Sequence, residues 1–306
     1  MIDLSIIIIS YNTKQYTLQT LASVYESLKK SSLSTEIIVV ENSSTDGSLE
    51  AIIKQYPKVV IIQTSTLIGF GSANNLGFAR AKGSTVLFLN SDVIVQKDAI
   101  DKMYLAIQEH PDMLISCQLL NEDMSLQHQG GSLPNWLNLS TWSLGLDHVS
   151  LVRKLCKPYQ QQYAISQGDT LETGWIGGTA IMMKASIFDQ IGRWDEQIFM
   201  YGEDVEFCFR AKRMGISSGI VLTSQIIHLK NKSTGSSKAS IIGEMKYLIY
   251  MMKKHHSTET NLLLIPYLKT VIGLGAITRW LIFALLPKHE ERSHAYLEAF
   301  KAVFLA

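Results

Sequence analysis

The sequence predicts an α/β protein with a mostly parallel central sheet flanked by helices and a helical C-terminal extension. Short apolar runs alternate with segments of helical spacing through the first third of the chain, which is typical of βαβ units. Beyond residue 238 the periodic segments all have helical spacing. The chain has 306 residues, 46% of them hydrophobic, and it can therefore bury a core of ordinary size or two lobes.

The first 117 residues are expected to alternate between strands and helices. The expected strands are runs rich in Ile, Val and Leu, at residues 4–9, 36–41, 58–63, 85–89 and 113–117. The expected helices have apolar positions three and four apart, at residues 18–28, 49–56, 73–82 and 97–110. The second of these helices is expected to bury Leu49, Ile52, Ile53 and Tyr56.

Periodicity fades between residues 119 and 173, where loops and short strands are expected. Beyond this region a strand is expected at residues 175–184 and a helix that begins with acids at residues 204–214. Two short strands at residues 218–223 and 224–229 and a further helix at residues 240–254 are expected to follow. Residues 231–238, rich in Ser, Gly and Lys, are expected to form a flexible connection.

The segment "LLLIPYLKTVIGLGAITRWLIFALLP", residues 262–287, is long enough to span a bilayer. It contains Pro266, Lys269 and Arg279, which make it a poor spanning helix. The sequence leaves two alternatives open, which are helices buried between lobes or subunits and an amphipathic surface that rests on a membrane. The expected partners of this segment are therefore a membrane surface or, in a homo-oligomer, a second copy of the chain.

Charge and cysteine content exclude several classes of function. Lys and Arg number 28 against 27 Asp and Glu, and the formal charge of +1 gives no field that would attract nucleic acid. The three cysteines are far apart and form no CxxC pair, which argues against a disulfide framework or a structural zinc site. The first residues, "MIDLSIIIISYN", lack the basic start of a secretory signal, so we expect a cytoplasmic protein.

The glycine-rich segment "GFGSANNLG", residues 69–77, does not match a dinucleotide-binding fingerprint. Asn74 stands where the third glycine would be, and the segment follows the third expected strand instead of the first. The sequence also contains no GxxxxGK[ST] segment. A Rossmann oxidoreductase and a P-loop nucleotidase are therefore both disfavoured.

Polar side chains follow three of the expected strands, at the edge where open α/β sheets bind ligands. The three clusters are Ser10, Tyr11 and Asn12, then Glu41 and Asn42, then Asn90, Ser91 and Asp92. Each cluster alone would be typical of a turn, but three together favour a binding site. A carboxylate beside amide and hydroxyl groups supplies the hard oxygen ligands that Mg²⁺ or Mn²⁺ needs, so Asp92 is the candidate metal ligand.

Several segments occur in an order that resembles the family 2 glycosyltransferases of the GT-A fold, most closely the bacterial rhamnosyltransferase-like branch. They are "SIIIISYN", "IIVVENSSTDGS", "GFGSANNLGFARAKG", "VLFLNSD", "WIGGTAIMMK", "GRWDEQIFMYGEDVEFCFRAKRMG" and "IIHLKNKST". The resemblance covers residues 2–235. It implies an inverting, metal-dependent transferase of bacterial surface polysaccharide synthesis.

Such an enzyme would move a sugar from a nucleoside diphosphate donor to a glycan or lipid-linked glycan acceptor. The first expected donor is dTDP-L-rhamnose. The alternatives are transfer from a UDP-hexose or UDP-N-acetylhexosamine, and a catalytically silent binding subunit of the same fold.

By this resemblance the donor and its Mg²⁺ or Mn²⁺ bind to polar residues of the first half. The donor-binding residues would be Ser10, Tyr11, Asn12, Glu41, Asn42, Asn74, Asn75, Asn90, Ser91 and Asp92. Tyr11 would stack on the nucleobase, and Glu41 stands where the family usually has aspartate. The family's aspartate-x-aspartate signature begins here with Asn90, so only Asp92 gives a carboxylate to the metal, with His228 as a second ligand.

Glu203 and Asp204 open an expected helix, where the helix dipole favours acids whether or not they catalyse a reaction. The resemblance implies that Asp204 is the general base for the acceptor hydroxyl and that Glu203 orients Asp204 or the acceptor. The acceptor would bind at Trp175, Gly177, Gly178, Trp194 and Asp195. Core packing explains the two tryptophans equally well.

The expected domains are a GT-A catalytic domain over residues 1–238 and a helical extension over residues 239–306. Within the catalytic domain, residues 1–118 would bind the nucleotide sugar and residues 119–238 would bind the acceptor. The resemblance implies a cytoplasmic enzyme with peripheral contact to the cytosolic face of the inner membrane.

Overall fold

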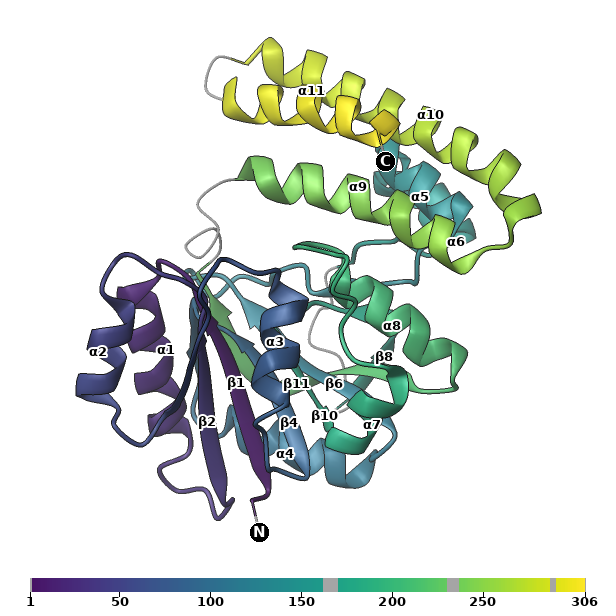
Figure 1. Cartoon of the computed structure of the whole chain (residues 1–306). Coiled ribbons are helices and arrows are strands. Elements are labelled where there is room, and N and C mark those ends of the chain that lie inside the picture. The colour runs from purple at the N-terminus through teal and green to yellow at the C-terminus, as the bar shows by residue number, and fades with distance from the viewer. Residues whose placement is uncertain (1, 162–169, 230–236, 287–289, 306) are drawn as a thin grey trace. The chain divides into compact units, whose positions relative to one another are not determined.

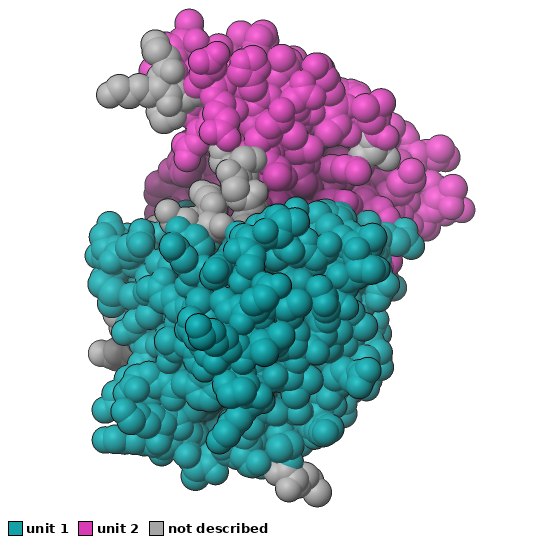
Figure 2. All heavy atoms as spheres, turned by 60° about the vertical axis from the view of Figure 1, so that its left-hand side comes forward, with its two compact units in different colours: residues 1–130, 162–199, 203–233 teal, residues 131–161, 200–202, 234–306 magenta. Residues whose placement is uncertain are grey.

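The structure is a computed structural model that describes residues 2–161, 170–229, 237–286 and 290–305 (Figure 1). The chain clusters into two compact units. The first contains residues 1–130, 162–199 and 203–233, and the second contains residues 131–161, 200–202 and 234–306 (Figure 2). Residues 131–161 therefore group with the C-terminal helices, whereas the sequence predicted a single boundary at residue 238.

The described part of the first unit is built on a nine-stranded sheet in the order β3-β2-β1-β4-β10-β6-β11-β5, with β8 paired to β11. The strands are β1 (Leu4–Ser10), β2 (Thr35–Glu41), β3 (Val60–Gln63), β4 (Thr85–Asn90), β5 (Val93–Val95), β6 (Met113–Leu120), β8 (Thr170–Thr173), β10 (Ala180–Lys184) and β11 (Ser217–His228). A separate two-stranded sheet pairs β7 (Gly130–Gly131) with β9 (Trp175–Ile176).

The sheet is mixed, and its parallel part comes from the first half of the chain. Strands β3, β2, β1 and β4 run parallel to one another, and β6 runs parallel to β11. In contrast, β10 is antiparallel to β4 and β6, and β11 is antiparallel to β5 and β8. Every residue of β1 is buried, as expected for a central strand whose two faces are both covered by helices.

Alternate residues of each strand face opposite helical layers. On one face, Leu4, Ile6 and Ile8 pack with apolar residues of α1 (Lys14–Ser27), α2 (Ser48–Gln55) and α4 (Ala99–Glu109). On the other face, α3 (Phe70–Phe78) lies so close that a Cβ on Gly77 would be 2.5 Å from Ile7. The same layer contains α7 (Ala185–Ile191) and α8 (Glu203–Arg213), which are joined by an aromatic cluster of Phe88, Phe188, Trp194 and Phe207.

Some expected elements differ in the structure. The two short strands expected at residues 218–229 form the single strand β11, because a register shift between Val221 and Gln225 lets it continue along β6. The strand expected over residues 175–184 is interrupted between β9 and β10, where Gly177 and Gly178 leave the ladder. In α2, Ile53 is 54% exposed and does not belong to the buried face, because this short helix packs through Ile52.

Residues 119–173 contain two helices that the sequence analysis missed, α5 (Trp136–Ser143) and α6 (Ser150–Leu155). Helix α5 begins with a capping box in which Asn135 and Asn138 each accept a hydrogen bond from the other's backbone. It is rich in Trp, Ser, Thr and Asn, whose helix propensity is low, so its local pattern gave no helical signal. Of the connection expected at residues 231–238, the part up to residue 236 lies outside the described residues.

The described part of the second unit is helical. Its elements are α5, η1 (Leu146–His148), α6, α9 (Ser237–His255), α10 (Thr258–Ala284) and α11 (Glu290–Leu305). Arg279 of α10 donates hydrogen bonds to the carbonyl oxygens of Trp142 and Ser143, where a cation also interacts favourably with the C-terminal end of the α5 dipole. A Cβ on Gly275 would lie 2.2 Å from the carbonyl oxygen of Ser143, so only glycine permits this close packing.

Helix α10 has 27 residues and is therefore about 40 Å long at 1.5 Å per residue. Among the described helices it alone is long and apolar enough to cross a membrane, by length and composition. Within its most apolar 18-residue window, 28% of the helix is buried inside the protein. The buried side includes Leu268, Ile272 and Ala276.

The other side of α10 exposes apolar side chains that recur at helical spacing. We call this surface the α10 row, and it consists of Leu263, Tyr267, Leu274, Leu281 and Leu285. Thr270 and Thr278 lie on the same side, and each places its hydroxyl 2.8 Å from a carbonyl oxygen one turn earlier in the helix. The exposed surface of α10 is therefore apolar and free of charged side chains along this row.

Candidate active site

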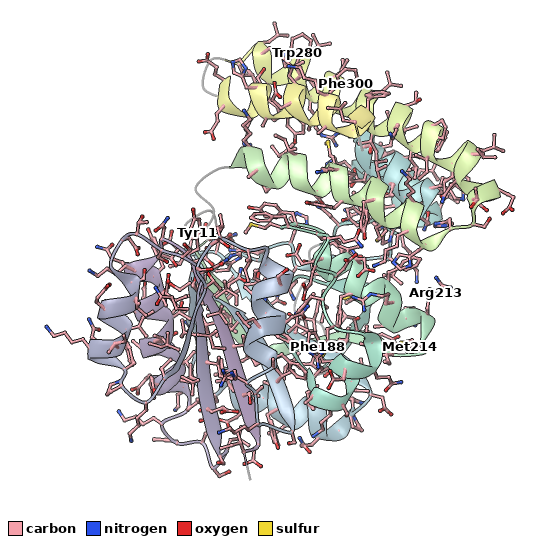
Figure 3. All side chains as sticks on the ribbon, in the orientation of Figure 1. Tyr11, Phe188, Arg213, Met214, Trp280 and Phe300 are labelled. Atoms are coloured by element: carbon pink, nitrogen blue, oxygen red, sulfur yellow. The ribbon has the colours of Figure 1, made fainter. Side chains whose placement is uncertain are left out.

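The polar clusters that follow β1, β2 and β4 lie together along the carboxyl edge of the parallel strands. In the register of the sheet, Ser10 is paired with Glu41, and Ile9 is paired with Asn90. Tyr11 is half-buried at the same edge (Figure 3). This is the edge at which α/β sheets bind ligands, because loops and helix N-termini converge there.

A row of hydroxyl groups on α1 and its N-cap holds the turn that carries Asp92. The row consists of Thr13, Thr17, Thr20, Ser23 and Ser27, at helical spacing. Oγ1 of Thr20 lies 2.9 Å and 2.8 Å from the carbonyl oxygens of Ser91 and Val93, and it accepts a hydrogen bond from the amide of Val93 at 3.1 Å. The apolar positions alone predicted this helix, although the spacing of its hydroxyls is also visible in the sequence.

Asp92 and His228 face each other where β5 pairs with β11. Nε2 of His228 lies 3.5 Å from Oδ1 of Asp92, and the carboxylate is 0% exposed while the imidazole is 15% exposed. The backbone fixes this pair, because His228 is paired with Val93 and the amide of Leu229 donates to the carbonyl oxygen of Asp92 at 3.0 Å.

The Asp92–His228 pair fits a divalent cation. A buried carboxylate oxygen beside an imidazole nitrogen is a donor set that suits Mn²⁺, and carboxylate oxygens also suit Mg²⁺. Among the described residues, no group of three or more His, Cys, Asp or Glu side chains is placed to hold a metal ion. A cation at this pair would therefore keep most of its coordination positions for ligand oxygens and water.

Two asparagines expected at the donor hold neighbouring loops with their amides. Asn12, which has a left-handed φ of 50°, accepts a hydrogen bond from the amide of Thr45 at 2.8 Å. Asn42 donates to the carbonyl oxygen of Ile68 at 2.9 Å and accepts from its amide at 3.0 Å. Both residues shape the edge of the site by fixing the loops beside it.

Glu41 and Asn74 each have a buried oxygen with no hydrogen-bond partner among the described residues. Glu41 is 1% exposed; its Oε1 accepts from the amide of Ser44 at 2.8 Å, and Oε2 is the atom without a partner. In Asn74 that atom is Oδ1, while Nδ2 donates to the carbonyl oxygen of Phe70 at 3.1 Å. Buried acceptors of this kind are rare, and a ligand hydroxyl or N–H group would satisfy them.

The residues expected at the acceptor have different environments. Trp194 is 2% exposed, and it packs on Phe207 with ring centroids 4.7 Å apart, so this structure places it in the core, one of the alternatives that the sequence left open. The Asn75 side chain fixes the backbone of Trp194: Oδ1 accepts from the Trp194 amide at 3.1 Å, and Nδ2 donates to the Trp194 carbonyl oxygen at 3.0 Å. Trp175 is 8% exposed, and Asp195 is half-buried.

Asp204 lies in the first turn of α8, beside the loop between β9 and β10. Its Oδ2 accepts a hydrogen bond from the amide of Gly178 at 2.8 Å, and its Oδ1 accepts from the amide of Val205 at 2.8 Å. Burial raises the pKa of Asp204 above its ordinary value, and the hydrogen bonds from the two amides oppose this rise. Glu203, which precedes it, is 6% exposed.

A backbone hydrogen bond joins the loop of Asp204 to the turn of Asp92. The amide of Asn90 donates to the carbonyl oxygen of Thr179 at 2.9 Å, and Thr179 directly follows the glycine that binds Asp204. A Cβ on Gly178 would lie 3.6 Å from Cβ of Asp204, so the glycine leaves open the space beside the carboxylate. Asp92 and Asp204 therefore belong to adjacent loops of one sheet edge.

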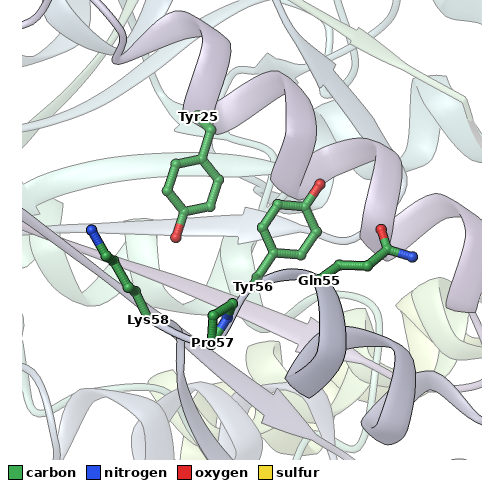
Figure 4. A pocket seen from close by; sticks show the side chains of 5 residues that line it. All are labelled: Tyr25, Gln55, Tyr56, Pro57 and Lys58. Carbon is green, nitrogen blue, oxygen red and sulfur yellow. The ribbon is translucent and has the colours of Figure 1, made fainter.

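A surface pocket of about 260 Å³ lies away from this site, between α1 and the segment that leads from α2 to β3 (Figure 4). It is lined by Tyr25, Gln55, Tyr56, Pro57 and Lys58. The rings of Tyr25 and Tyr56 stack with centroids 5.4 Å apart. None of the expected site residues lines this pocket.

The family model "Glycosyl transferase family 2" matches residues 5–192, which is more than half of the chain. The chain belongs to glycosyl transferase family 2. This family 2 glycosyltransferase is 26% identical over 255 residues to N-acetylglucosaminyl-diphospho-decaprenol L-rhamnosyltransferase of Mycobacterium tuberculosis, covering 78% of this chain and 79% of that relative. It is also 26% identical over 234 residues to rhamnosyltransferase WbbL of Escherichia coli, covering 73% of this chain and 82% of that protein. The expected rhamnosyltransferase-like branch is confirmed.

Solved structures confirm the GT-A fold. Mannosyltransferase PcManGT from Pyrobaculum calidifontis, solved with GDP-Man and Mn²⁺, matches with a TM-score of 0.60 at 13% identity, covering 99% of this chain and 86% of that chain. GalNAc-T7, solved with UDP, GalNAc and Mn²⁺, matches with a TM-score of 0.60 at 14% identity, covering 83% of this chain and 48% of that chain.

Replacing Thr20 by valine should destabilise the glycosyltransferase. The change keeps the shape of the side chain but leaves the buried amide of Val93 without its acceptor, which costs about 1–3 kcal/mol. Urea denaturation would measure the loss. The matched control is Thr20→Ser, which keeps the hydroxyl and should lose less stability. Equal stability of Thr20→Val and wild type would contradict the role given to the α1 hydroxyl row.

The raised pKa of Asp204 predicts a pH-dependent stability. Between its unfolded pKa of about 3.9 and its folded pKa, the folded protein binds more protons than the unfolded chain, so this group's stabilising contribution is lost as pH rises through that window. Asp204→Asn cannot ionise, and its stability relative to wild type should therefore improve as pH rises. Urea denaturation across this pH range would measure the difference.

Asp123→Asn is the control for this pH series. Asp123 is fully exposed, and the hydroxyl of Ser125 lowers its pKa, so its effect on stability should have the opposite dependence on pH. If Asp204→Asn lost stability relative to wild type as pH rose, the carboxylate would not carry the raised pKa that its burial implies.

Proposed function

We propose that this enzyme transfers a sugar with inversion from a nucleoside diphosphate donor to a glycan or lipid-linked glycan acceptor in bacterial surface polysaccharide synthesis. Rhamnose from dTDP-L-rhamnose is the first candidate, because two relatives are named as rhamnosyltransferases. A UDP-hexose or UDP-N-acetylhexosamine is the second, because another relative, from Haloferax volcanii, is named as a hexosyltransferase. The observation that carries the proposal is the placement of Asp92, His228 and Asp204 on adjacent segments of one sheet edge.

The donor would bind along the edge formed by β1, β2 and β4. The buried Oε2 of Glu41 is an acceptor for an N–H of the base or a hydroxyl of the ribose. Tyr11, half-buried beside it, offers a ring on which the base would stack. Glutamate in place of the family's usual aspartate reaches one methylene further, and its other oxygen is fixed by the amide of Ser44.

Asp92 and His228 would hold the Mg²⁺ or Mn²⁺ that accompanies the donor. When bound, the cation would neutralise charge on the departing diphosphate. Relatives of this fold were solved with Mn²⁺, which supports a divalent cation in this site. The diphosphate would then leave without a protein acid to protonate it.

Asp204 would act as the general base. Its carboxylate takes the proton from the acceptor hydroxyl, whose oxygen forms a bond to the anomeric carbon from the side opposite the diphosphate. The bond from that carbon to the diphosphate oxygen breaks, and its electron pair leaves with the diphosphate. The raised pKa of Asp204 suits this role, because the base must hold the proton once it has taken it.

The acceptor would approach through the loop between β9 and β10. Gly177 and Gly178 have no side chains to obstruct Asp204, and the amide of Gly178 orients its carboxylate. Trp175 and Asp195 remain candidates for contacts with the acceptor, and Glu203 would orient Asp204. Trp194 supports this side of the site from the core.

The donor should stabilise the enzyme more when Mn²⁺ is also present than when it is absent. A ligand at 100 times its dissociation constant adds about 2.7 kcal/mol to the free energy of unfolding. We expect this gain with Mn²⁺ and dTDP-L-rhamnose, or with a UDP sugar if the second candidate is correct. Thermal unfolding with each donor, with and without Mn²⁺, would measure it.

Two variants separate donor binding from chemistry. Asp204→Asn should keep the stabilisation by donor and Mn²⁺ but lose about 10²- to 10⁴-fold in transfer rate, which is the usual contribution of a general base. Asp92→Asn should lose the part of the stabilisation that depends on Mn²⁺. Full transfer activity in both variants would rule out these assignments.

The enzyme would reach a lipid-linked acceptor by resting on a membrane through the α10 row. The row is apolar and uncharged, and the exposed Lys253 and Lys254 lie at the end of α9, just before α10 begins. The relative from Mycobacterium tuberculosis is named for an N-acetylglucosaminyl-diphospho-decaprenol acceptor. Apolar surface beside basic residues suits an anionic lipid surface. This contact would lie at the cytosolic face of the inner membrane.

Replacing Leu274 and Leu281 together by glutamate should abolish binding to vesicles that contain phosphatidylglycerol. Both leucines are about half exposed, so the change should leave the fold intact. The control is Leu105→Glu on α4, a leucine that is 60% exposed and outside the α10 row. Vesicle flotation would measure binding. A wild-type enzyme that does not bind vesicles, but forms dimers that the double variant abolishes, would assign the row to a second copy of the chain.

A further inference from the structure

Gln127 is a buried glutamine whose amide group contacts both the ring and the backbone of His228. It is 1% exposed and lies between β6 and β7. Its Nε2 donates to the carbonyl oxygen of Leu120 at 3.0 Å and to that of His228 at 2.6 Å. Its Oε1 lies 3.2 Å from Nδ1 of His228.

These contacts fix which way the Gln127 amide points. Its two N–H groups face two carbonyl oxygens, which only accept hydrogen bonds. A flipped amide would place an oxygen against both carbonyls and leave all three acceptors without a donor. Oε1 must therefore be the atom that faces the imidazole.

The orientation of Gln127 in turn fixes the tautomer of His228. Because Oε1 only accepts, Nδ1 must carry the proton that makes the hydrogen bond. In a neutral imidazole the lone pair is then on Nε2, which is the nitrogen 3.5 Å from Oδ1 of Asp92. The ring thus presents a lone pair toward the same space as a carboxylate oxygen, which is the arrangement that a cation requires.

We infer that Gln127 is the positioning residue of the metal site, holding His228 in the tautomer and orientation in which Nε2 is a ligand. This inference rests on the proposed function, in which Asp92 and His228 hold the cation. A metal-bound histidine almost always donates its other ring N–H to an acceptor, and loss of such an acceptor typically weakens metal affinity 10- to 100-fold. Here the acceptor is a neutral amide, and the same amide group also bonds the backbone of the ligand.

Gln129 offers a matched comparison two residues further along the chain. It is also buried, at 2% exposed, and its Oε1 accepts from Nε2 of Gln118 at 3.2 Å and from the amide of Leu119. Its side chain bonds β6 and makes no hydrogen bond with His228 among the described residues. Replacing either glutamine by methionine removes buried hydrogen bonds at similar volume, but only the change at Gln127 removes the acceptor for Nδ1.

Binding of Mn²⁺, followed by the loss of the electron paramagnetic resonance signal of free Mn²⁺, tests the inference without measuring transfer. The titration uses dTDP or UDP, whichever stabilises the wild-type enzyme. Gln127→Met should weaken Mn²⁺ binding 10- to 100-fold. Gln129→Met should leave it unchanged, even if both variants lose similar stability. His228→Ala should weaken it at least as much as Gln127→Met.

The outcomes separate this inference from the proposed function. If wild type and His228→Ala bind Mn²⁺ equally, the metal site itself is wrong. If His228→Ala weakens binding but Gln127→Met does not, the role of Gln127 is overturned while the metal site stands. Equal weakening by Gln127→Met and Gln129→Met would also overturn it, because the effect would then be a general loss of structure.

The tautomer can be measured in the unmodified enzyme, which keeps the inference testable if Gln127→Met does not fold. Two-bond ¹H–¹⁵N correlation spectra of protein labelled in histidine distinguish Nδ1–H from Nε2–H rings. His228 would be assigned by the signal that His228→Ala removes. In the metal-free enzyme, at a pH where the ring is neutral, we expect the proton on Nδ1. A proton on Nε2 would overturn the inference.

Discussion

The burial of the Asp92 carboxylate is the constraint on which the arrangement of the site depends. A carboxylate that is 0% exposed is costly unless its surroundings hold it in place and supply compensating charge or hydrogen bonds. Two separate parts of the chain do the holding, the antiparallel pairing of β5 with β11 and the hydroxyl row of α1. Helix α1 has hydroxyl side chains on positions where an ordinary surface helix would have apolar residues. These positions contribute less apolar packing, but their hydrogen bonds hold the turn of Asp92 in place.

The strand next to β4 in the sheet, β10, runs in the opposite direction, and this affects the same sheet edge. Because β10 is antiparallel to β4, its beginning lies beside the end of β4, and the carbonyl oxygen of Thr179 meets the amide of Asn90. Gly178 then contributes its amide to Asp204. A parallel strand at this position would have brought its C-terminal end to the edge, and the loop that orients the Asp204 carboxylate would lie elsewhere. The mixed topology thus brings the turn of Asp92 and the loop that binds Asp204 to one sheet edge.

The second unit uses charge and small residues in a different way. Arg279 looked from the sequence like an obstacle to an apolar helix, but it bonds the end of α5, and Gly275 permits the close approach. These two residues are thus part of the packing within the unit. The α10 row lies on the side of the helix opposite its buried residues, so the packing side of α10 is separate from its exposed apolar side.

The sequence by itself determined most strands and helices of the first 117 residues, the polar clusters that follow three of the strands and the family to which the chain belongs. These features are local, because each apolar run or turn consists of consecutive residues. The family is indicated by short motifs that occur in a fixed order along the chain. Helix α5 was not predicted, because its capping box and not its composition favours a helix. Ile53 was wrongly predicted to be buried, because an amphipathic pattern does not show how wide a face of the helix the protein covers.

Only the tertiary structure decided which polar residues meet. Asn12 and Asn42, which the sequence predicts as donor contacts, hold neighbouring loops in the structure, and Trp194 joins the aromatic core. Gln127 had no signal at all, because it lies in a segment without periodicity and acquires its role from a partner 101 residues away. Contacts between distant residues depend on strand order and register, and a single sequence records neither. Local hydrogen bonding and hydrophobic spacing determine the helices and strands, whereas the pairing of the strands determines which side chains lie together in the site.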